Sequence, residues 1–360
     1  MKIEKATARY EKWLGRQITL LPHDLRLKHD RMAESPFPFL RATFYRWMQT
    51  WPEVSPATAH APVVLAVGDL HVENFGTWRD AEGRLIWGIN DFDETSPLPY
   101  TCDLVRLAAS AVIARNENHL TLPCSSICGA ILEGYREGIR GGGRAFVLSE
   151  HHHWLREAAT GVERDPVAFW TKMDALYRWR KEVPKRARKA LEKMLPDPKI
   201  PYMLCTRIAG LGSLGRQRFV AIAEWNGGRL ARETKALAPS ACLWAGTKRA
   251  TKEILYQRIL DTSVRAVDPL VRLRDGWIVR RLAPYCSRIE LVQLPRKRDE
   301  LKLLAAMGYE TANIHWGTPS EMPNVKKDLN RRPANWLHDA ANATAESVKK
   351  DWKDWRAAWK

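Results

Sequence analysis

The sequence has 360 residues, enough chain for two domains or lobes with large apolar cores. Hydrophobic residues make up 45% and charged residues 28%, which excludes a disordered or fibrous chain. Lys and Arg number 58 against 41 acidic residues, so the net charge of +17 predicts a positive surface that attracts phosphates, nucleic acid or acidic proteins.

We expect a cytoplasmic protein that does not cross a membrane. No segment of the sequence reaches the roughly 18–20 uninterrupted apolar residues of a membrane span. Residues 1–13 are charged and lack the apolar centre of a signal peptide. The six cysteines are scattered, as is typical of reduced thiols, and the pair Cys124 and Cys128 has no second close pair to complete a zinc site.

The N-terminal part of the chain predicts helices and then two short strands. Residues 1–60 have a helical pattern that breaks at SPFPF (35–39), because proline disfavours helix at its own position and the one before it. Residues 63–67 (VVLAV) and 84–90 (RLIWGIN) are apolar runs typical of buried strands. We expect a loop at 68–79 between them.

The middle of the chain has a mostly helical pattern. Asp103 opens an amphipathic helix with an acidic N-terminus, and helices continue through 115–195. Within this part, the segment 178–193 holds eight Lys or Arg against Glu182 and Glu192. A solvated helix face is the favoured interpretation of that segment, and an anion-binding surface is the alternative.

A proline-rich connector, PDPKIP, marks the clearest boundary in the chain, and strand-like patterns follow it. The runs at 218–225 and 229–237 flank an Asn-Gly-Gly turn, which is a strong hairpin signal. We expect a helix over 246–267, a strand over 276–284 and helices from about Arg296 to the end.

Two acidic clusters follow the two predicted strands of the N-terminal part. The first, GDLHVENFG, supplies Asp69, and the second, NDFDE, supplies Asp91 and Asp93. Mg²⁺ prefers oxygen ligands and usually takes one or two carboxylates together with substrate phosphates. With Asn74 as a neutral oxygen ligand, the clusters predict a Mg²⁺ site. Simple capping of turns by acidic side chains is the alternative.

A glycine-rich segment, GLGSLG (210–215), matches the pattern G-x-G-x-x-G. A dinucleotide-binding turn would open a helix, whereas a strand-like run follows here, and a P-loop would have Lys and Ser or Thr where Arg216 and Gln217 stand. What remains is a glycine hairpin that covers phosphates, as in protein kinases, with a lysine on a following strand. The expected phosphate-binding residues are Gly210, Gly212, Ser213, Gly215 and Lys235.

These segments resemble the signatures of aminoglycoside phosphotransferases and related kinase-like enzymes. Residues 68–74 resemble their catalytic loop, H-G-D-x-H-x-x-N, with Val67 in place of the first histidine. The tripeptide DFD resembles their metal-binding D-x-D, and Asp103-Leu104 resembles the start of their next helix. The resemblance implies that Asp69 is the catalytic base and that Asn74 and Asp91 hold a metal ion. It also implies that Asp93 holds a second metal ion and that Asp103 braces the catalytic loop. His71 is the second candidate catalytic residue, and we expect it to order the catalytic loop rather than to transfer protons.

The order of the motifs resembles that of the bacterial family DUF2252. The segments SPF (35–37) and FLR (39–41) precede both acidic clusters, and the glycine segment, Lys235 before ALAPS, and His315 follow them. In an ordinary kinase the glycine loop and the lysine precede the catalytic loop, whereas here they follow it by about 140 residues.

The resemblance therefore implies an α+β, two-lobed, kinase-like fold that is circularly permuted, which a fold tolerates when its natural termini lie close together at the surface. Residues 1–200 would form the large helical lobe with the catalytic and metal-binding loops. Residues 201–294 would form the small nucleotide-binding lobe, and residues 295–360 would return to the large lobe as helices.

A kinase lysine is normally positioned by a glutamate from the next helix. Glu253 is the candidate here, and Glu233 is the competitor, because it lies two residues from Lys235 on the same strand and shares its face. Arg41 in the SPFPFLR segment is either a ligand for substrate or phosphate, or a buried structural arginine.

We expect an ATP- and Mg²⁺-dependent phosphotransferase that acts on a hydroxyl of a small molecule or of a protein side chain. Nucleotidyl transfer and an ATP-binding pseudokinase are alternatives on the same fold. A basic nucleic-acid-binding protein is the alternative from another class, suggested by the net charge, the segment 178–193 and the 16 Trp. A basic rim beside Asp69 would indicate an anionic acceptor.

Overall fold

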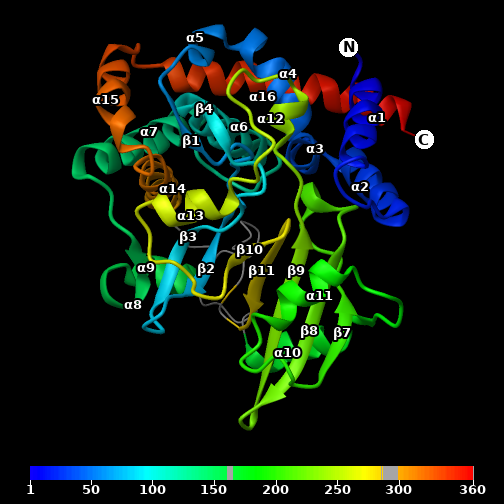
Figure 1. Ribbon diagram of the computed structural model, residues 1–360. Coiled ribbons are helices and arrows are strands. Elements are labelled where there is room, and N and C mark those ends of the chain that lie inside the picture. The colour runs from blue at the N-terminus through cyan, green and yellow to red at the C-terminus, as the bar shows by residue number, and fades with distance from the viewer. Residues whose placement is uncertain (160–164, 285, 287–298, 360) are drawn as a thin grey trace.

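The computed structural model describes residues 1–159, 165–284, 286 and 299–359. It has the mixed α and β character that the sequence predicts, and its elements form two parts (Figure 1). We call them the helical lobe, which holds both chain ends, and the sheet lobe, which is built around a six-stranded sheet. Within the described ranges, no helix has both the length and the apolar character needed to cross a lipid bilayer.

The centre of the helical lobe is α6 (Tyr100–Asn116), in which every residue from Tyr100 to Ala114 is buried. The sequence predicts an amphipathic helix from Asp103, but the helix begins three residues earlier and is surrounded, because α7 and α16 pack against it. The other helices of this lobe are α1 (Ile3–Leu14), α2 (Pro22–Glu34), α3 (Pro36–Ala42), α4 (Phe44–Val54), α5 (Pro56–Ala59), α7 (Cys124–Gly141), α8 (Leu148–His151), α9 (His153–Ala159), α12 (Ala241–Trp244), α13 (Tyr256–Thr262), α14 (Glu300–His315), α15 (Met322–Arg331) and α16 (Trp336–Ala358).

Two small antiparallel sheets in the helical lobe position the acidic clusters. One pairs β1 with β4, and the other has the order β2-β3-β5. The first acidic cluster follows β1, and the second lies between β3 and β4. The bounds are β1 (Val63–Ala66), β2 (Phe75–Arg79), β3 (Leu85–Ile89), β4 (Ser96–Pro99) and β5 (Phe146–Val147).

The sheet lobe is an antiparallel sheet with the strand order β10-β11-β9-β8-β7-β6. Apolar residues of α11 (Lys185–Glu192) pack on one face of this sheet, and Met173 of α10 (Pro166–Asp174) packs on the other. The strands are β6 (Tyr177–Arg178), β7 (Tyr202–Thr206), β8 (Arg218–Trp225), β9 (Gly228–Ala236), β10 (Arg272–Arg274) and β11 (Trp277–Leu282).

The strands expected at 63–67, 84–90 and 276–284 are present as β1, β3 and β11. The expected hairpin is confirmed as well, because β8 and β9 are joined through Asn226 and Gly227, which both have the positive φ that a tight hairpin turn requires.

Three expectations were wrong in detail. The expected loop at 68–79 contains β2, which pairs with β3 along its whole length. The segment SPFPF interrupts the helices only at Ser35, because a proline fits the first turn of α3. The expected helix over 246–267 is limited to α13, since Gly246 has a positive φ just after α12 and the chain then turns.

The elements of the sheet lobe begin before residue 201. Strand β6 pairs with β7, and α11 packs on the sheet, although both precede the proline-rich connector. Residues 287–294, at the end of the expected small lobe, and the start of the returning helices at 296–298 lie outside the described residues.

Helices α7 and α14 come into backbone contact at Gly134 of α7 and Gly308 of α14. A Cβ at Gly308 would lie 2.0 Å from the carbonyl oxygen of Ile131, so Gly308→Ala should force the helices apart and lower the free energy of unfolding by about 1–3 kcal/mol. Gly129→Ala, also on α7, has open space around its Cβ and should instead stabilise by up to about 1 kcal/mol. Urea unfolding measures both, and equal effects of the two substitutions would contradict this packing.

Glu310 of α14 is buried beside β3, where its Oε1 accepts from the amide of Ile89 (3.2 Å) and its Oε2 accepts from Asn313 Nδ2 (2.7 Å). Burial raises the pKa of Glu310 to about 7, although Arg265 opposes the shift. The folded state therefore holds this proton more tightly than the unfolded state does. Its stabilisation is complete below the unfolded pKa of about 4.5 and is lost as the pH rises through about 7.

We accordingly expect wild-type protein to lose on the order of 2 kcal/mol more stability than Glu310→Gln between about pH 5 and pH 7.5. Urea unfolding at the two pH values measures the difference. The same pH dependence in both proteins would show that the carboxyl titrates normally in the folded state.

Candidate functional site

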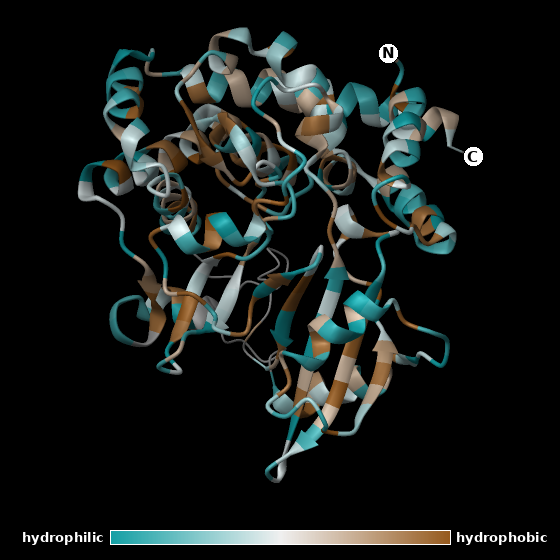
Figure 2. Cartoon of the chain, viewed as in Figure 1, coloured by the Kyte–Doolittle hydropathy of each residue, from teal (hydrophilic) through white to brown (hydrophobic). Residues whose placement is uncertain are grey.

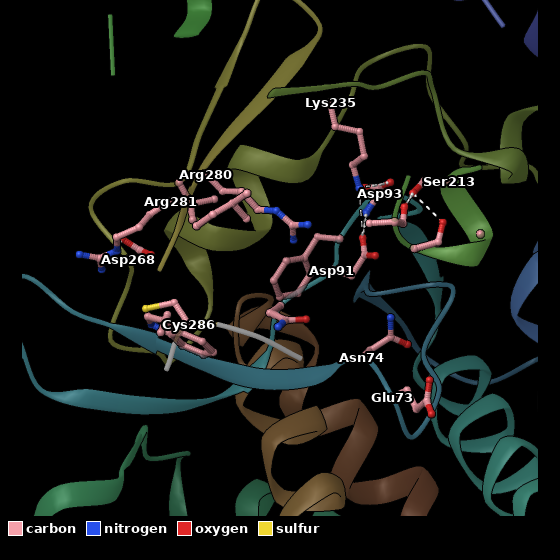
Figure 3. A pocket seen from close by; sticks show the side chains of 18 of the residues that line it. Glu73, Asn74, Asp91, Asp93, Ser213, Lys235, Asp268, Arg280, Arg281 and Cys286 are labelled. Atoms are coloured by element: carbon pink, nitrogen blue, oxygen red, sulfur yellow. Dashed lines mark hydrogen bonds and ion pairs between the residues drawn. The ribbon is translucent and has the colours of Figure 1, made fainter. Parts of the chain in front are cut away.

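A cleft of about 420 Å³ opens between the two lobes, a volume typical of small-molecule sites. The helical lobe contributes the first acidic loop (residues 67–74) and the second acidic loop (residues 90–94), and the sheet lobe contributes the glycine turn (residues 210–215) and β9. Figure 3 shows side chains from both lobes pointing toward one another. The expected site residues that line the cleft are Asp69, His71, Asn74, Asp91, Asp93, Gly210, Gly212, Ser213 and Lys235.

The start of the first acidic loop is fixed by a buried carboxylate. Asp103 of α6 accepts hydrogen bonds from the amides of Val67 (2.8 Å) and Gly68 (2.9 Å). His315 of α14 donates from Nε2 to the same carboxylate at 3.0 Å. Gly68 has a φ of +84°, and a Cβ there would lie 2.4 Å from a backbone oxygen of the second acidic loop. Asp103 thus lies where a brace for the loop is needed.

The rest of the first acidic loop is closed by its own side chains. Asn74 Oδ1 accepts from the amide of His71 at 2.6 Å, and His71 Nδ1 accepts from the amide of Glu73 at 3.2 Å. Glu73 forms an ion pair with Arg41 at 2.6 Å. Both side chains of this pair are largely buried, so Arg41 has a structural partner at the wall of the cleft.

Asp69 is paired with a buried arginine of α6. Arg106 donates from Nε to Asp69 Oδ1 at 2.8 Å, and its Nη2 donates both to the same oxygen and to the carbonyl of Leu40 (2.8 Å). The guanidinium packs against the rings of Phe44 and Trp47. Burial raises the pKa of Asp69, and Arg106 opposes that shift. This pair fixes the orientation of the carboxylate at the cleft.

Lys235 joins the sheet lobe to the second acidic loop. Its Nζ lies 2.7 and 2.6 Å from the two carboxylate oxygens of Asp93 and 3.9 Å from Asp91 Oδ1 (Figure 3). Burial alone would raise the pKa of Asp93, but Lys235 and Arg216 lower it to about 2. The side chain of Asp91 is 43% exposed, and its enclosure in the cleft and the adjacent Asp93 carboxylate raise its pKa.

Arg216, just after the glycine turn, binds the same loop. Its guanidinium lies 3.4 Å from Asp93 and 3.2 Å from Glu94. Glu94 Oε2 also accepts from Ser240 Oγ (3.0 Å) and from the amide of Ala241 (2.6 Å). Burial raises the pKa of Glu94 to about 7, against the effect of Arg216. The second acidic loop is therefore tied to the sheet lobe at several points.

The glycine turn connects β7 to β8 and lies on the first acidic loop. It contains a short 3₁₀ helix, Leu211–Ser213, where the sequence predicts the tip of an extended hairpin. A Cβ at Gly212 would lie 3.0 Å from the carbonyl oxygen of Arg41 and 3.6 Å from Asp69 Oδ2, so a glycine is needed for this close approach. The turn and Asp69 are thus in contact at one wall of the cleft, and the turn and the acidic loop share one site, as the sequence predicts.

Helix α2 anchors the glycine turn from the helical lobe. The amide of Leu21 donates to the carbonyl of Gly215 at 2.8 Å, and Leu25 occupies the space where a Cβ of Gly215 would lie. Buried Lys28 donates from Nζ to the carbonyl of Gly212 at 3.4 Å. Burial lowers the pKa of Lys28 to about 8. Gly215 does not line the cleft, and its role is to let the turn pack on α2.

Three arginines surround Glu233 on the face of the sheet that lines the cleft. Glu233 accepts from Arg207 Nη1 (2.8 Å), Arg218 Nη1 (2.6 Å) and Arg280 Nε (2.7 Å), and its side chain is 1% exposed. These guanidiniums keep the pKa of Glu233 well below its usual range although burial opposes them. Arg218 also donates to Ser213 Oγ in the glycine turn at 2.8 Å. We call these four residues the arginine cluster; it combines three positive charges with one negative charge.

The glutamates expected to position Lys235 have other surroundings. Glu233 pairs with the three arginines of the arginine cluster and lies directly opposite one of them, Arg280, in the sheet. Glu253 is exposed and does not line the cleft, because the segment before α13 is not helical. The expectation that a glutamate positions Lys235 was therefore wrong. Within the described residues, Lys235 is paired with Asp93.

The donor set of the cleft fits a metal ion that arrives with a phosphate ligand. Among the described residues, no three or more His, Cys, Asp or Glu side chains gather closely enough to hold a metal by themselves. Asp91 faces the cleft, Asn74 has already given Oδ1 to a backbone amide, and both oxygens of Asp93 are taken by Lys235. Mg²⁺ commonly takes one or two carboxylates and completes its shell with water and phosphate oxygens.

Several residues of the site were not singled out from the sequence. Arg106 had a detectable signal, because a charge inside an otherwise apolar run needs a buried partner. The arginine cluster and Lys28 had no such signal, since basic residues are frequent throughout this chain and their convergence depends on strand register and helix packing. The residues missed are Lys28, Glu94, Arg106, Arg207, Arg216, Arg218 and Arg280.

Neutralising Glu233 tests the arginine cluster. Glu233→Gln removes the only carboxylate among three guanidiniums and should lower the free energy of unfolding by about 3–5 kcal/mol, because a buried charge then lacks its partner. Pyrophosphate should raise the melting temperature of this variant more than that of wild type, since the added anion replaces the lost charge. Thermal unfolding with and without pyrophosphate at constant ionic strength measures both effects.

Glu224→Gln is the matched control, because Glu224 is exposed on β8 of the same hairpin. It should change stability by less than about 0.5 kcal/mol. Equal stability of Glu233→Gln and the control would mean that the three arginines do not depend on this carboxylate.

Comparison with known proteins bears on the helical lobe. No curated protein and no solved structure matches the chain. Residues 20–168 match the family described as "Uncharacterized protein conserved in bacteria (DUF2252)". The matched segment contains both acidic loops, Asp103 and Arg106, whereas the glycine turn and Lys235 lie beyond it. The match supports the predicted resemblance to this family over residues 20–168.

Proposed function

We propose that this protein is an ATP- and Mg²⁺-dependent phosphotransferase with a circularly permuted, kinase-like fold. The observation that carries the proposal is the convergence of Asp69, Asp91, Lys235 and the glycine turn on one cleft, although 166 positions separate Asp69 from Lys235 along the chain. Phosphoryl transfer needs such a set: a group that orients the attacking hydroxyl, an oxygen ligand for Mg²⁺, and cations and amides for the phosphates.

The arrangement of the sheet lobe supports a kinase-like fold. Kinases cover the phosphates with a glycine-rich loop and carry the lysine on their third strand. Here the glycine turn joins β7 to β8, and Lys235 lies on the next strand, β9. The two chain ends lie near each other on the helical lobe, where α1 contacts α16 (Figure 1). A permuted chain would have such neighbouring ends, because one break in the unpermuted fold creates both of them.

The phosphate chain would lie along the cleft face of β9 and β11. Lys235 and Glu233 are two residues apart on this face, so Lys235 and the arginine cluster form a row of cations about 7 Å long. Arg207 and Arg280 retain exposed fractions of 29% and 30%, which leaves donors for a ligand. Guanidiniums bind phosphate oxygens through paired hydrogen bonds.

Asp69 would orient the acceptor hydroxyl. Arg106 occupies Oδ1, and within the described residues no hydrogen bond reaches Oδ2, the oxygen nearest the glycine turn. A hydroxyl that donates to Oδ2 would be held for attack on a terminal phosphate bound below the turn. Asp91 would hold Mg²⁺, which would neutralise charge on the transferred phosphoryl group. Asn74 would add only the second lone pair of Oδ1, because the His71 amide already donates to that oxygen.

Asp91→Asn tests the proposal by calorimetric titration with ATP. We expect wild-type protein to bind ATP at least about tenfold more tightly with Mg²⁺ than with a chelator, a difference of about 1.4 kcal/mol. The variant should lose that difference, because an amide is a much poorer ligand for Mg²⁺ than a carboxylate.

Asp354→Asn, on the exposed side of α16, should behave as wild type. Absence of ATP binding by wild type at millimolar concentration would end the proposal. Release of AMP or of pyrophosphate during turnover would replace phosphoryl transfer by nucleotidyl transfer, and ATP binding without turnover on any hydroxyl would indicate a pseudokinase.

A further inference from the structure

The sheet lobe carries a strongly basic surface on the side opposite the cleft. It consists of the exposed Lys and Arg side chains of the segment 180–193, which holds seven cations against only Glu182 and Glu192. We call it the basic face. Its cations are Arg180, Lys181, Lys185, Arg186, Arg188, Lys189 and Lys193, and all seven are exposed.

Helix α11, which carries much of the basic face, has no exposed apolar side. The apolar residues of α11, Ala187, Ala190 and Leu191, are buried against Phe219 and other residues of the sheet. Figure 2 shows α11 as a hydrophilic helix over the more apolar strands. A helix that inserts into a lipid surface must keep its apolar side free. The buried apolar side of α11 therefore argues against a membrane as the partner.

The positions of the cations on α11 destabilise the helix. Lys185, Lys189 and Lys193 follow one another at intervals of four residues, so like charges are neighbours on its surface. The first turn carries Lys185 and Arg186 and no acidic residue, where the helix dipole favours negative charge. None of these seven cations forms an ion pair with a carboxylate in the described ranges. A bound polyanion would relieve both repulsions.

Aromatic rings lie beside these charges. Tyr177, on the edge strand β6, is 73% exposed. Trp179 is partly exposed, packs edge-on against Phe219 under α11, and lies 5.9 Å from the ammonium of Lys181. Cations that follow a phosphate backbone, together with aromatic rings on which bases stack, are the features by which proteins bind single-stranded nucleic acid.

We propose that the basic face is a binding surface for single-stranded nucleic acid, held by phosphate contacts from α11 and by base stacking on Tyr177 and Trp179. Because α11 covers the face of the sheet that points away from the cleft, binding there leaves the cleft open. The proposal therefore stands whether or not the protein transfers phosphate.

Charge reversal on α11 tests the proposal. Fluorescence anisotropy with a labelled single-stranded oligonucleotide should give an affinity that falls steeply with salt for wild type. Lys185→Glu/Lys189→Glu should weaken binding at least about tenfold and reduce the slope of log K against log salt by about 1.4, which corresponds to two lost phosphate contacts. Its melting temperature should be equal to or above that of wild type, because repulsion within the helix is removed.

Lys350→Glu/Lys353→Glu on α16 is the matched control, because it changes the net charge equally on the helical lobe and should leave the affinity nearly unchanged. Tyr177→Ala should weaken binding without changing the salt slope. Equal loss in the α11 and α16 variants would reduce the effect to net charge and overturn the proposal. So would binding of anionic vesicles that the α11 variant loses while oligonucleotide affinity is unchanged.

Discussion

The contact between Lys235 and Asp93 is the interaction on which the candidate site depends, because it joins the two lobes at the cleft. Both carboxylate oxygens of Asp93 face the ammonium, and Arg216 adds a second cation from the end of the glycine turn. These charges are largely buried, and a buried carboxylate is stable in its ionised form only beside such partners. Burial raises the pKa of both Asp93 and Glu94. Lys235 and Arg216 together reverse this shift for Asp93, whereas Arg216 does not reverse it for Glu94.

Around this contact, charge is organised in two layers. The helical lobe supplies the carboxylates. Arg106 holds Asp69, and the backbone amide of Asp93 donates to Asp91. The sheet lobe supplies cations whose positions are set by one buried glutamate, Glu233. A ligand with phosphates and a metal ion would fit between a positive wall and a negative wall. The proposed function rests on the convergence of these groups on one cleft rather than on any single residue.

Local patterns predicted the parts of the fold that depend on neighbours in sequence. The runs at 63–67 and 218–225 form strands because their apolar residues are buried on a sheet, and the Asn-Gly-Gly turn forms a hairpin because its backbone needs positive φ. Patterns failed where tertiary contacts decide the outcome. Glu253 was expected on a helix beside Lys235, but the helix α13 begins only after it. The arginine cluster depends on register across four strands, which no short segment encodes.

The proposed triphosphate and its metal ion would bind in the cleft that is lined by Lys235, Asp91 and Arg280. A crystal structure with Mg²⁺ and a non-hydrolysable ATP analogue tests this placement most directly. We predict phosphate density within hydrogen-bond distance of Lys235 and Arg280, with the metal on Asp91. Density for the nucleotide elsewhere on the molecule, with this cleft empty at saturating ligand, would contradict the account.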